Sequence, residues 1–216
     1  MTPHTLSDCQ VLDQQDPLRS LRDLFQLPEG VIYLDGNSLG VLPKATPARV
    51  AQAVAQEWGN DLIKSWNTAG WFQMPLKVGN KIARLIGAKD HEVVAADSTS
   101  INLFKVLSAA LSIAKADQPE KNIILSERTN FPTDLYIAEA LCKERGYQLK
   151  LVEAEELHAA LQENVAVLML THVNYRTGAM LNLKDLTAAA HAVGALAIWD
   201  LAHSAGAVPV DLNGAS

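Results

Sequence analysis

The feature that most limits the fold of this chain is a regular alternation, beyond residue 90, of short β-branched runs and longer stretches with helical periodicity. The short runs predict strands, and the longer stretches, with apolar residues every three or four positions, predict helices. Strands are expected near residues 92–95, 122–125, 148–152, 165–170 and 195–199, and helices near 101–114, 133–145, 154–162 and 183–193. This alternation predicts an α/β fold with a mostly parallel sheet flanked by helices. In such sheets a ligand binds at the carboxyl ends of the strands.

The chain contains no repeat, low-complexity tract or linker that would divide it. Residues 1–30 are expected to form an N-terminal arm, and residues 31–216 one large domain. With 216 residues, of which 49% are hydrophobic, the chain is long enough for one sizeable core. Neither a signal peptide nor a membrane helix is indicated, so we expect a soluble, unprocessed protein.

Charge and cysteine content narrow the classes of partner. Charged residues make up 19% of the chain and the net charge is −6, which lacks the basic excess of nucleic-acid-binding proteins. Small molecules or other subunits are the expected partners. Cys9 and Cys142 are far apart and show no zinc-ligand spacing, which argues against a disulfide framework or a structural metal site. A reducing cytoplasm is the expected location.

Three hydroxyl residues follow the first expected strand. Ser98, Thr99 and Ser100 stand directly before the helical run LFKVLSAAL. Unpaired backbone N–H groups and the positive end of the helix dipole favour an anion such as phosphate at a helix start. The alternative is that one of these residues serves only as a helix cap. The glycine-rich motifs GxGxxG and GxxxxGKS/T are absent from the sequence, which argues against a dinucleotide or a P-loop nucleotide.

The next expected strand is followed by the segment ERTNFPTDLY. Phe131 is expected at the junction between loop and helix, where its ring would either lie against a flat aromatic cofactor or staple the helix start into the core. Pro132 suits the first helical turn. Asp134 is expected within that turn, where the helix dipole favours a carboxylate. Both interpretations of Phe131 stay open on this segment alone.

The last two expected strands end in a hydroxyl, a carboxylate and two histidines. Thr171 and His172 follow VAVLML. Asp200 directly follows ALAIW, and His203 stands three residues after Asp200. A carboxylate directly after an apolar strand is costly unless it is paired, and a protonated pyridine nitrogen is a suitable partner. His203 would bond a phosphate or orient Asp200. The alternatives are a helix cap for Asp200, a core histidine for His203, and a metal site that no HExxH-like or carboxylate-rich pattern supports.

Taken together, the successive strand ends offer a phosphate site, an aromatic ring, a hydroxyl and a carboxylate. This set matches one flat, phosphorylated heteroaromatic ring. Pyridoxal 5'-phosphate (PLP) is such a ring, and a protein that keeps its nitrogen protonated makes it an electron sink.

Six blocks of the sequence closely resemble kynureninase, a PLP enzyme of the fold type I aminotransferase-like superfamily. They are YLDGNSLG (33–40), EWGNDLIKSWNTAGW (57–71), STSINLFKVLSAAL (98–111), NFPTDLY (130–136), THVNYRTG (171–178) and IWDLAHSAGAVPVDL (198–212). The likeness covers essentially the whole chain. Because the last two blocks also resemble cysteine desulfurases, they indicate fold and cofactor, whereas NFPTD and YLDGNSLG discriminate. Desulfurase-like relatives usually stack a histidine on the cofactor, where this chain has Phe131.

The resemblance implies PLP as cofactor and a set of cofactor-binding residues. These are Thr99, Ser100, Phe131, Pro132, Thr133, Asp134, Thr171, Asp200 and His203. In this set Thr99 and Ser100 would bind the phosphate, and Thr171 would lie beside the ring. Asp200 would pair with the pyridine nitrogen, with His203 nearby.

The implied reaction is the hydrolysis of L-kynurenine to anthranilate and L-alanine, in tryptophan degradation and NAD biosynthesis. Preference for kynurenine over 3-hydroxykynurenine stays open. Ser38 and Trp66 would belong to the substrate side. Since relatives of this fold build each active site from two chains, we expect a homodimer with the N-terminal arm at the subunit boundary.

The family's Schiff-base lysine follows the DLAH block, whereas the last lysine here is Lys184 and the sequence ends at Ser216. That lysine and the smaller C-terminal domain are expected beyond Ser216. No catalytic residue is therefore assigned within these residues, and we expect the chain alone to be inactive. Two other hypotheses remain: another PLP-dependent lyase of the cysteine desulfurase type, and an inactive binding or subunit-interaction fragment.

Overall fold

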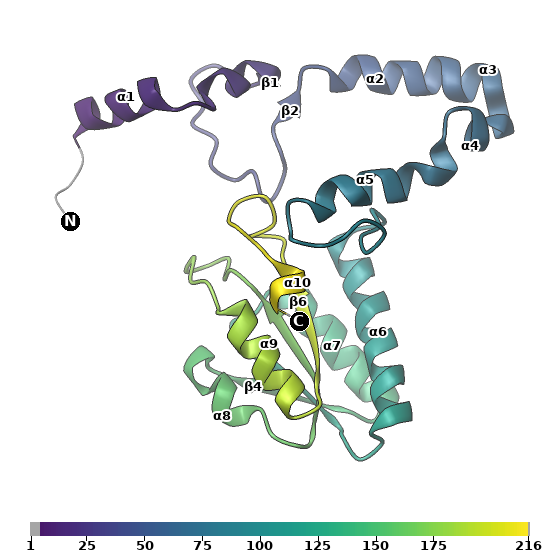
Figure 1. The fold of residues 1–216 in the computed structure, drawn as a ribbon, viewed down its shortest axis with the longest axis vertical. Helices are drawn as coiled ribbons and strands as arrows, with labels where there is room; N and C mark the ends of the chain where they lie inside the picture. The colour runs from purple at the N-terminus through teal and green to yellow at the C-terminus, as the bar shows by residue number, and fades with distance from the viewer. Residues whose placement is uncertain (1–4, 216) are drawn as a thin grey trace. The chain divides into compact units, whose positions relative to one another are not determined.

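The computed structural model describes residues 5–215, and it divides the chain into two compact units. The first unit extends to Phe72 and the second begins at Gln73. Figure 1 shows the helices and strands of both units. Each unit is described by itself.

The first unit consists of short helices and one small antiparallel ladder, in which β1 pairs with β2. Its elements are α1 (Leu6–Gln15), η1 (Arg19–Leu24), β1 (Phe25–Gln26), β2 (Leu42–Pro43), α2 (Thr46–Gln52), η2 (Ala53–Trp58), α3 (Gly59–Asp61), η3 (Leu62–Lys64) and α4 (Ser65–Thr68), with η4 (Trp71–Gln73) at its end. Of residues 5–72, Ser65 alone is buried, and its hydroxyl lies within hydrogen-bonding distance of the carbonyl oxygens of Glu57 and Leu62. This unit has no apolar core of its own among these residues.

The second unit is an α/β structure built on a four-stranded parallel sheet with the strand order β4-β3-β5-β6. Its elements are α5 (Met74–Ala83), α6 (Thr99–Asp117), β3 (Ile123–Glu127), α7 (Pro132–Arg145), β4 (Gln148–Val152), η5 (Ala154–Glu156), α8 (Leu157–Ala160), β5 (Val165–Thr171), α9 (Leu183–Ala192), β6 (Leu196–Asp200) and α10 (Leu212–Ala215). The predicted fold class is confirmed, as are four of the five predicted strands and all four predicted helical regions.

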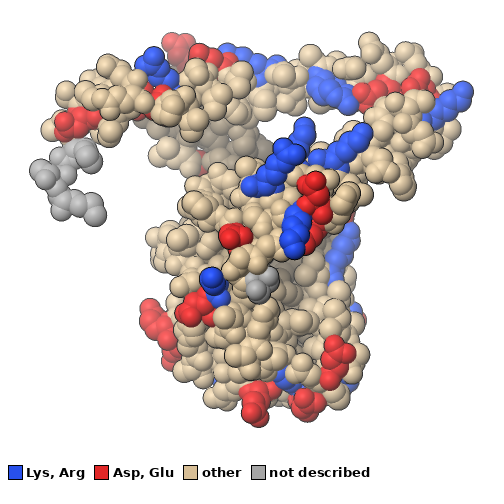
Figure 2. Space-filling model, viewed as in Figure 1, with Lys and Arg blue, Asp and Glu red and all other residues tan. Residues whose placement is uncertain are grey.

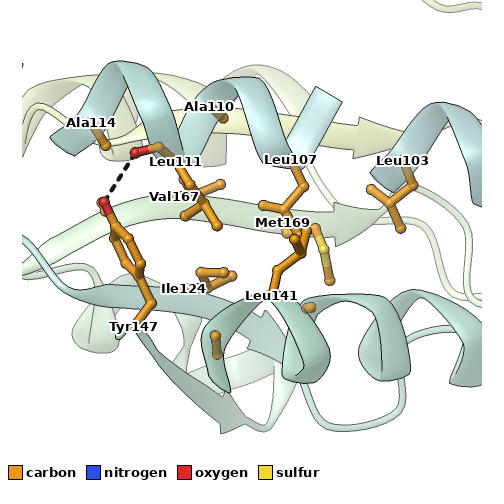
Figure 3. Close-up of a cluster of buried hydrophobic side chains, with 13 residues drawn as sticks. Leu103, Leu107, Ala110, Leu111, Ala114, Ile124, Leu141, Tyr147, Val167 and Met169 are labelled. Carbon is orange, nitrogen blue, oxygen red and sulfur yellow. Dashed lines mark hydrogen bonds between the residues drawn. The ribbon is translucent and has the colours of Figure 1, made fainter. Parts of the chain in front are cut away.

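Two layers of helices cover the sheet. α6 and α7 pack on one face, and α8 and α9 on the other (Figure 1). All residues of β5 are buried, and its side chains alternate between the layers. Val167 and Met169 face Leu107 of α6 (Figure 3), whereas Leu168 and Leu170 belong to the cluster around α8 and α9. A strand buried on both faces needs an unbroken apolar run, which is what the sequence VAVLML provides.

The prediction of a strand at residues 92–95 is wrong. This segment forms no ladder with any described strand; instead the Ala95 N–H donates to the carbonyl oxygen of Pro75 at 3.1 Å. The absent side chain of Gly79 permits the contact with α5, because a Cβ there would lie 2.0 Å from the Val93 carbonyl oxygen. Val94 remains 60% exposed. A β-branched run predicts an extended chain, but it does not supply a pairing partner.

Lysine, arginine and carboxylate side chains are interspersed on the face of the molecule drawn in Figure 2. No helix within residues 5–215 combines the length and the hydrophobicity needed to cross a membrane. Both cysteines are free: Cys9 is exposed, and Cys142 is a buried residue of α7.

Candidate functional site

The parallel register brings the ends of β5 and β6 together. Thr171 and Asp200, the last residues of these strands, are direct partners in the ladder. The next residue along, His172, donates its backbone N–H to the Asp200 carbonyl oxygen at 2.9 Å. Parallel strands end at one edge of a sheet, so the polar residues that follow them collect there. The pairing of Thr171 with Asp200 places a hydroxyl and a carboxylate side by side at this edge.

Two side chains of α6 bond the loop that precedes the helix and hold this loop in place. Asn102 donates to the Ala96 carbonyl oxygen at 2.6 Å, and Lys105 forms an ion pair with Asp97. Asp97 has a φ of +44°, an uncommon value that turns the chain into the helix. Ser98 precedes the first helical residue, and its side chain makes no capping hydrogen bond in the described part of the chain. The alternative of a simple serine cap is therefore not observed.

Thr99 and Ser100 form the first turn of α6, with Thr99 exposed and Ser100 half-buried. The first N–H groups of a helix have no partner within the helix, and the helix dipole adds a partial positive charge. Because the Ser98 side chain does not cap these N–H groups, they are open to an anion.

Phe131 stands at the N-cap of α7, and Pro132 follows it in the first turn. The Phe131 ring packs edge-on against Tyr175, with ring centroids 5.1 Å apart and an interplanar angle of 69°. Its centroid also lies 6.1 Å from that of His203. Phe131 is half-buried, and Thr133 beside it is exposed. The ring thus belongs to an aromatic cluster at the strand ends, and sequence reasoning did not single out Tyr175 although it lies in the THVNYRTG block.

Asp134 and Asp200 form a pair of neighbouring carboxyl groups. Asp134 is only 2% exposed, and burial, together with the charge of Asp200 and a hydrogen bond shared with it, raises the pKa of Asp134 to about 7. Asp200 also accepts a 2.6 Å hydrogen bond from the Ala202 N–H. Within residues 5–215 neither carboxylate forms an ion pair with a lysine, arginine or histidine. This pair favours a bound cation or a shared proton.

The two histidines have separate surroundings. His203 Nδ1 lies 3.3 Å from the Val173 carbonyl oxygen, so the ring is oriented by the β5–α9 loop. His172 is 5% exposed, and its Nδ1 has no hydrogen-bond partner among the described residues. Burial lowers the pKa of His172, opposed by a hydrogen bond with the Leu181 backbone. No three His, Cys, Asp or Glu side chains in residues 5–215 are grouped so as to hold a metal ion.

A cavity of about 440 Å³ connects the start of α6 with the end of β6. Thr99 and Asn102 line it from α6, and Trp199, Asp200 and Ala202 from β6 and the loop beyond. Its size is within the range of small-molecule and cofactor pockets. The cavity brings the open helix start and one carboxylate of the pair to the same space.

Ser38 and Trp66 belong to the first unit. Both are exposed there; Trp66 is 51% exposed within α4, and the Ser38 N–H donates to the Asp35 carbonyl oxygen. Their placement beside a substrate stays a prediction.

The family model described as Aminotransferase class-V matches residues 32–215. The chain belongs to the aminotransferase class-V family. Among curated proteins, it is 59% identical over 212 residues to a kynureninase of Pseudomonas fluorescens and 54% identical over 214 residues to a kynureninase of Burkholderia mallei. These alignments cover 97% and 98% of this chain and 51% of each relative. The chain thus spans about half the length of the curated relatives it matches.

Two solved structures are similar to this chain in fold. A C-DES mutant with glycine covalently linked to its PLP cofactor gives a TM-score of 0.73 at 19% identity, covering 88% of this chain and 51% of that one. The cysteine desulfurase CsdA from Escherichia coli gives a TM-score of 0.73 at 18% identity, with coverages of 91% and 51%. At these identities the likeness concerns the fold alone.

Proposed function

We propose that the full-length protein containing this chain uses PLP to hydrolyse L-kynurenine, with 3-hydroxykynurenine as a second substrate, to anthranilate or its hydroxy form and L-alanine. This proposal rests on the Asp134–Asp200 carboxyl pair, which lies at the strand ends together with the uncapped start of α6. The 59% identity to a kynureninase over 97% of the chain supports this choice of reaction within the family.

The carboxyl pair suits the ring nitrogen of PLP. Burial of Asp134 and, after it, the charge of the neighbouring Asp200 raise the pKa of Asp134 to about 7. A protonated pyridine nitrogen between or beside them would offset this repulsion and would itself be stabilised as a cation. Asp200, at the strand end and facing the cavity, would hold the proton on the nitrogen, and Asp134 would reinforce it from α7.

The other residues suit the rest of the ring. The first turn of α6, with Thr99 and Ser100, would bind the phosphate through its backbone N–H groups and hydroxyls. Phe131, with Pro132 and Thr133 at the start of α7, would cover one face of the ring and exclude water from it. Thr171 would lie at the ring edge, and His203 beside Phe131.

When bound, PLP supplies an electron-accepting ring that stabilises negative charge on the substrate. The residues of this chain orient that ring and keep its nitrogen protonated. Ser38 and Trp66 would contact the substrate. The lysine that bonds the cofactor is expected in the part of the relatives' length that this chain does not span, as is the smaller C-terminal domain.

The test is the release of anthranilate, followed by its fluorescence, when full-length protein and PLP are given L-kynurenine and, separately, its 3-hydroxy form. We expect Asp200→Asn to lower turnover by about a hundredfold or more, since it removes a charge aimed at the reacting system. Asp185→Asn, which changes an exposed carboxylate paired with His158, is the matched control and should keep full turnover.

The same experiment decides between the alternatives. Turnover of cysteine without turnover of kynurenine would favour a desulfurase-type lyase, as in several proteins that share the fold. Failure to turn over either substrate, in a full-length protein with its lysine, would favour an inactive binding or subunit-interaction role. Anthranilate release that is unaffected by Asp200→Asn would remove Asp200 from the proposed site.

We also propose that the full-length protein is a cytoplasmic homodimer that acts in tryptophan degradation and NAD biosynthesis. Support for assembly comes from the first unit, where Ile32 and Leu34 are 88% and 90% exposed. Apolar side chains exposed to this degree favour coverage by another protein surface. Sedimentation of the active full-length protein as a monomer at low concentration would contradict the dimer.

A further inference from the structure

A chain of buried hydrogen bonds lies directly behind the candidate site. It joins three side chains of different segments: Ser126 in β3, Asn130 before α7 and Thr171 at the end of β5. They are 0%, 4% and 4% exposed. Ser126 Oγ lies 2.6 Å from the Met169 carbonyl oxygen, and Asn130 Nδ2 lies 2.9 Å from Ser126 Oγ. Asn130 Oδ1 is bonded to both the Thr171 hydroxyl and the Phe131 N–H.

The direction of every bond in this chain is fixed by two backbone groups. The Phe131 N–H can only donate, so the Asn130 atom 2.6 Å from it must be the oxygen, which leaves the amide NH₂ facing Ser126. At the other end, the Met169 carbonyl oxygen can only accept, so the Ser126 hydroxyl donates its proton there and receives the Asn130 NH₂ on a lone pair.

These directions determine how the Thr171 hydroxyl is oriented. Since Asn130 presents an oxygen to it, the Thr171 hydroxyl must donate its single proton to Asn130. A hydroxyl group has one proton and two lone pairs, so only lone pairs remain for any further partner of Thr171. Toward any molecule at the strand ends, Thr171 is therefore an acceptor.

We propose that Asn130 is a positioning residue that holds the Thr171 hydroxyl as an acceptor toward the cofactor, and thereby favours the protonated form of the cofactor's ring hydroxyl. This inference rests on the proposed function, because it takes PLP as the ligand. PLP carries one ring hydroxyl, which donates when it is protonated. A neighbouring acceptor stabilises that neutral form and disfavours the ionised one.

The test uses full-length protein loaded with PLP, and its readout is the pH midpoint of the cofactor's visible absorption, which changes as the ring loses a proton. Asn130→Ala frees the Thr171 proton to point at the ring, where it would stabilise the ionised oxygen. We expect the midpoint to fall by about one pH unit, the size of one hydrogen bond of ordinary net strength. Thr171→Val, which removes the acceptor, should lower the pH midpoint as well.

Two variants separate this role from a structural one. Asn174 is also buried, and its side chain also bonds a neighbouring loop, at Thr129, but within residues 5–215 it forms no hydrogen bond with Thr171. Asn174→Ala should therefore leave the midpoint unchanged. Thr171→Ser keeps the hydroxyl and should retain the wild-type midpoint. In a Thr171→Val background, Asn130→Ala should cause no further shift, because there is no hydroxyl left to turn.

The outcomes separate the two proposals. A full-length protein that does not bind PLP would overturn both. Binding of PLP with an Asn130→Ala midpoint equal to wild type, or with the same shift in Asn174→Ala, would overturn the role of Asn130 alone. If Asn130→Ala does not fold, as judged by urea unfolding, the pair Thr171→Val and Thr171→Ser decides: equal midpoints in these two variants would overturn the proposal.

Discussion

The carboxyl pair leads to a prediction in which stability and ligand binding change in opposite directions. Asp134→Asn replaces a buried acid by a neutral side chain of the same shape. Burial and the neighbouring Asp200 raise the pKa of Asp134 from 3.8 to about 7 in the folded protein. Without ligand, the ionised carboxylate is therefore disfavoured in the folded state, and the substitution removes that penalty.

The sign and the size follow from proton linkage. Below pH 3.8 the folded and unfolded states both carry the proton, and the penalty is absent. Between pH 3.8 and about 7 the folded state keeps the proton that the unfolded state has released, so the free energy of unfolding falls as pH rises. Above pH 7 the loss is complete, with an upper limit of about 4 kcal/mol from about 1.4 kcal/mol per pKa unit. We expect Asp134→Asn to gain about 2 to 4 kcal/mol at pH 8 and close to zero near pH 4.

The assay is urea unfolding of the full-length protein without PLP, at pH 4, 5.5 and 8. Asp13→Asn, at an exposed position in α1, is the control and should show no pH-dependent gain. In a parallel titration, Asp134→Asn should bind PLP more weakly than wild type, because it removes one carboxylate of the pair proposed to hold the ring nitrogen. A gain in stability that is the same at pH 4 and pH 8, or no gain at pH 8, would refute the account of the pair.

Three further predictions concern the fold. Gly79→Ala places a Cβ 2.0 Å from a backbone carbonyl oxygen and should cost about 1 to 3 kcal/mol in urea unfolding, whereas Gly36→Ala, with nothing within 4 Å, should cost far less. Leu107→Ala, at a fully buried position, should cost about 2 to 5 kcal/mol in the same assay; a cost below 1 kcal/mol would mean that the site collapses around it. Burial raises the pKa of Cys142 to about 11, so iodoacetamide at pH 8 should label exposed Cys9 and leave Cys142 unlabelled, as read by peptide mass mapping; equal labelling of the two would contradict the burial.

The central part of the second unit could be predicted because β5 is buried on both faces. The run VAVLML of β5 has to be apolar throughout, and a continuous apolar run of this length bounded by polar residues is a strong signal for a central strand. The run at residues 92–95 is similar in composition but packs against α5 through Gly79. Composition favours an extended chain in both places, and only the tertiary partner separates a strand from a packed loop.

The first unit was harder to predict for a related physical reason. Residues 46–68 fold into α2, η2, α3, η3 and α4, which are helices of three to seven residues. None of these residues except Ser65 is buried, so no apolar stripe of regular period marks the helices in the sequence. Hydrophobic periodicity reports burial, and where burial is lacking it gives little information on local structure.

The candidate site shows where reasoning from local sequence ends. Topology alone predicts that Thr171 and Asp200 meet, because both end parallel strands. For Asp134, the first turn of α7 suggests a carboxylate stabilised by the helix dipole, yet its pKa is raised, since burial and Asp200 outweigh the dipole. The NFPTD block marks Asn130 only as part of a resemblance, and nothing in that segment indicates a contact with Thr171. The role proposed for Asn130 depends on Thr171, 41 positions away, and on the fixed polarity of two backbone groups. Such contacts set which protons the site can offer, and they exist only once the sheet has brought the strand ends together.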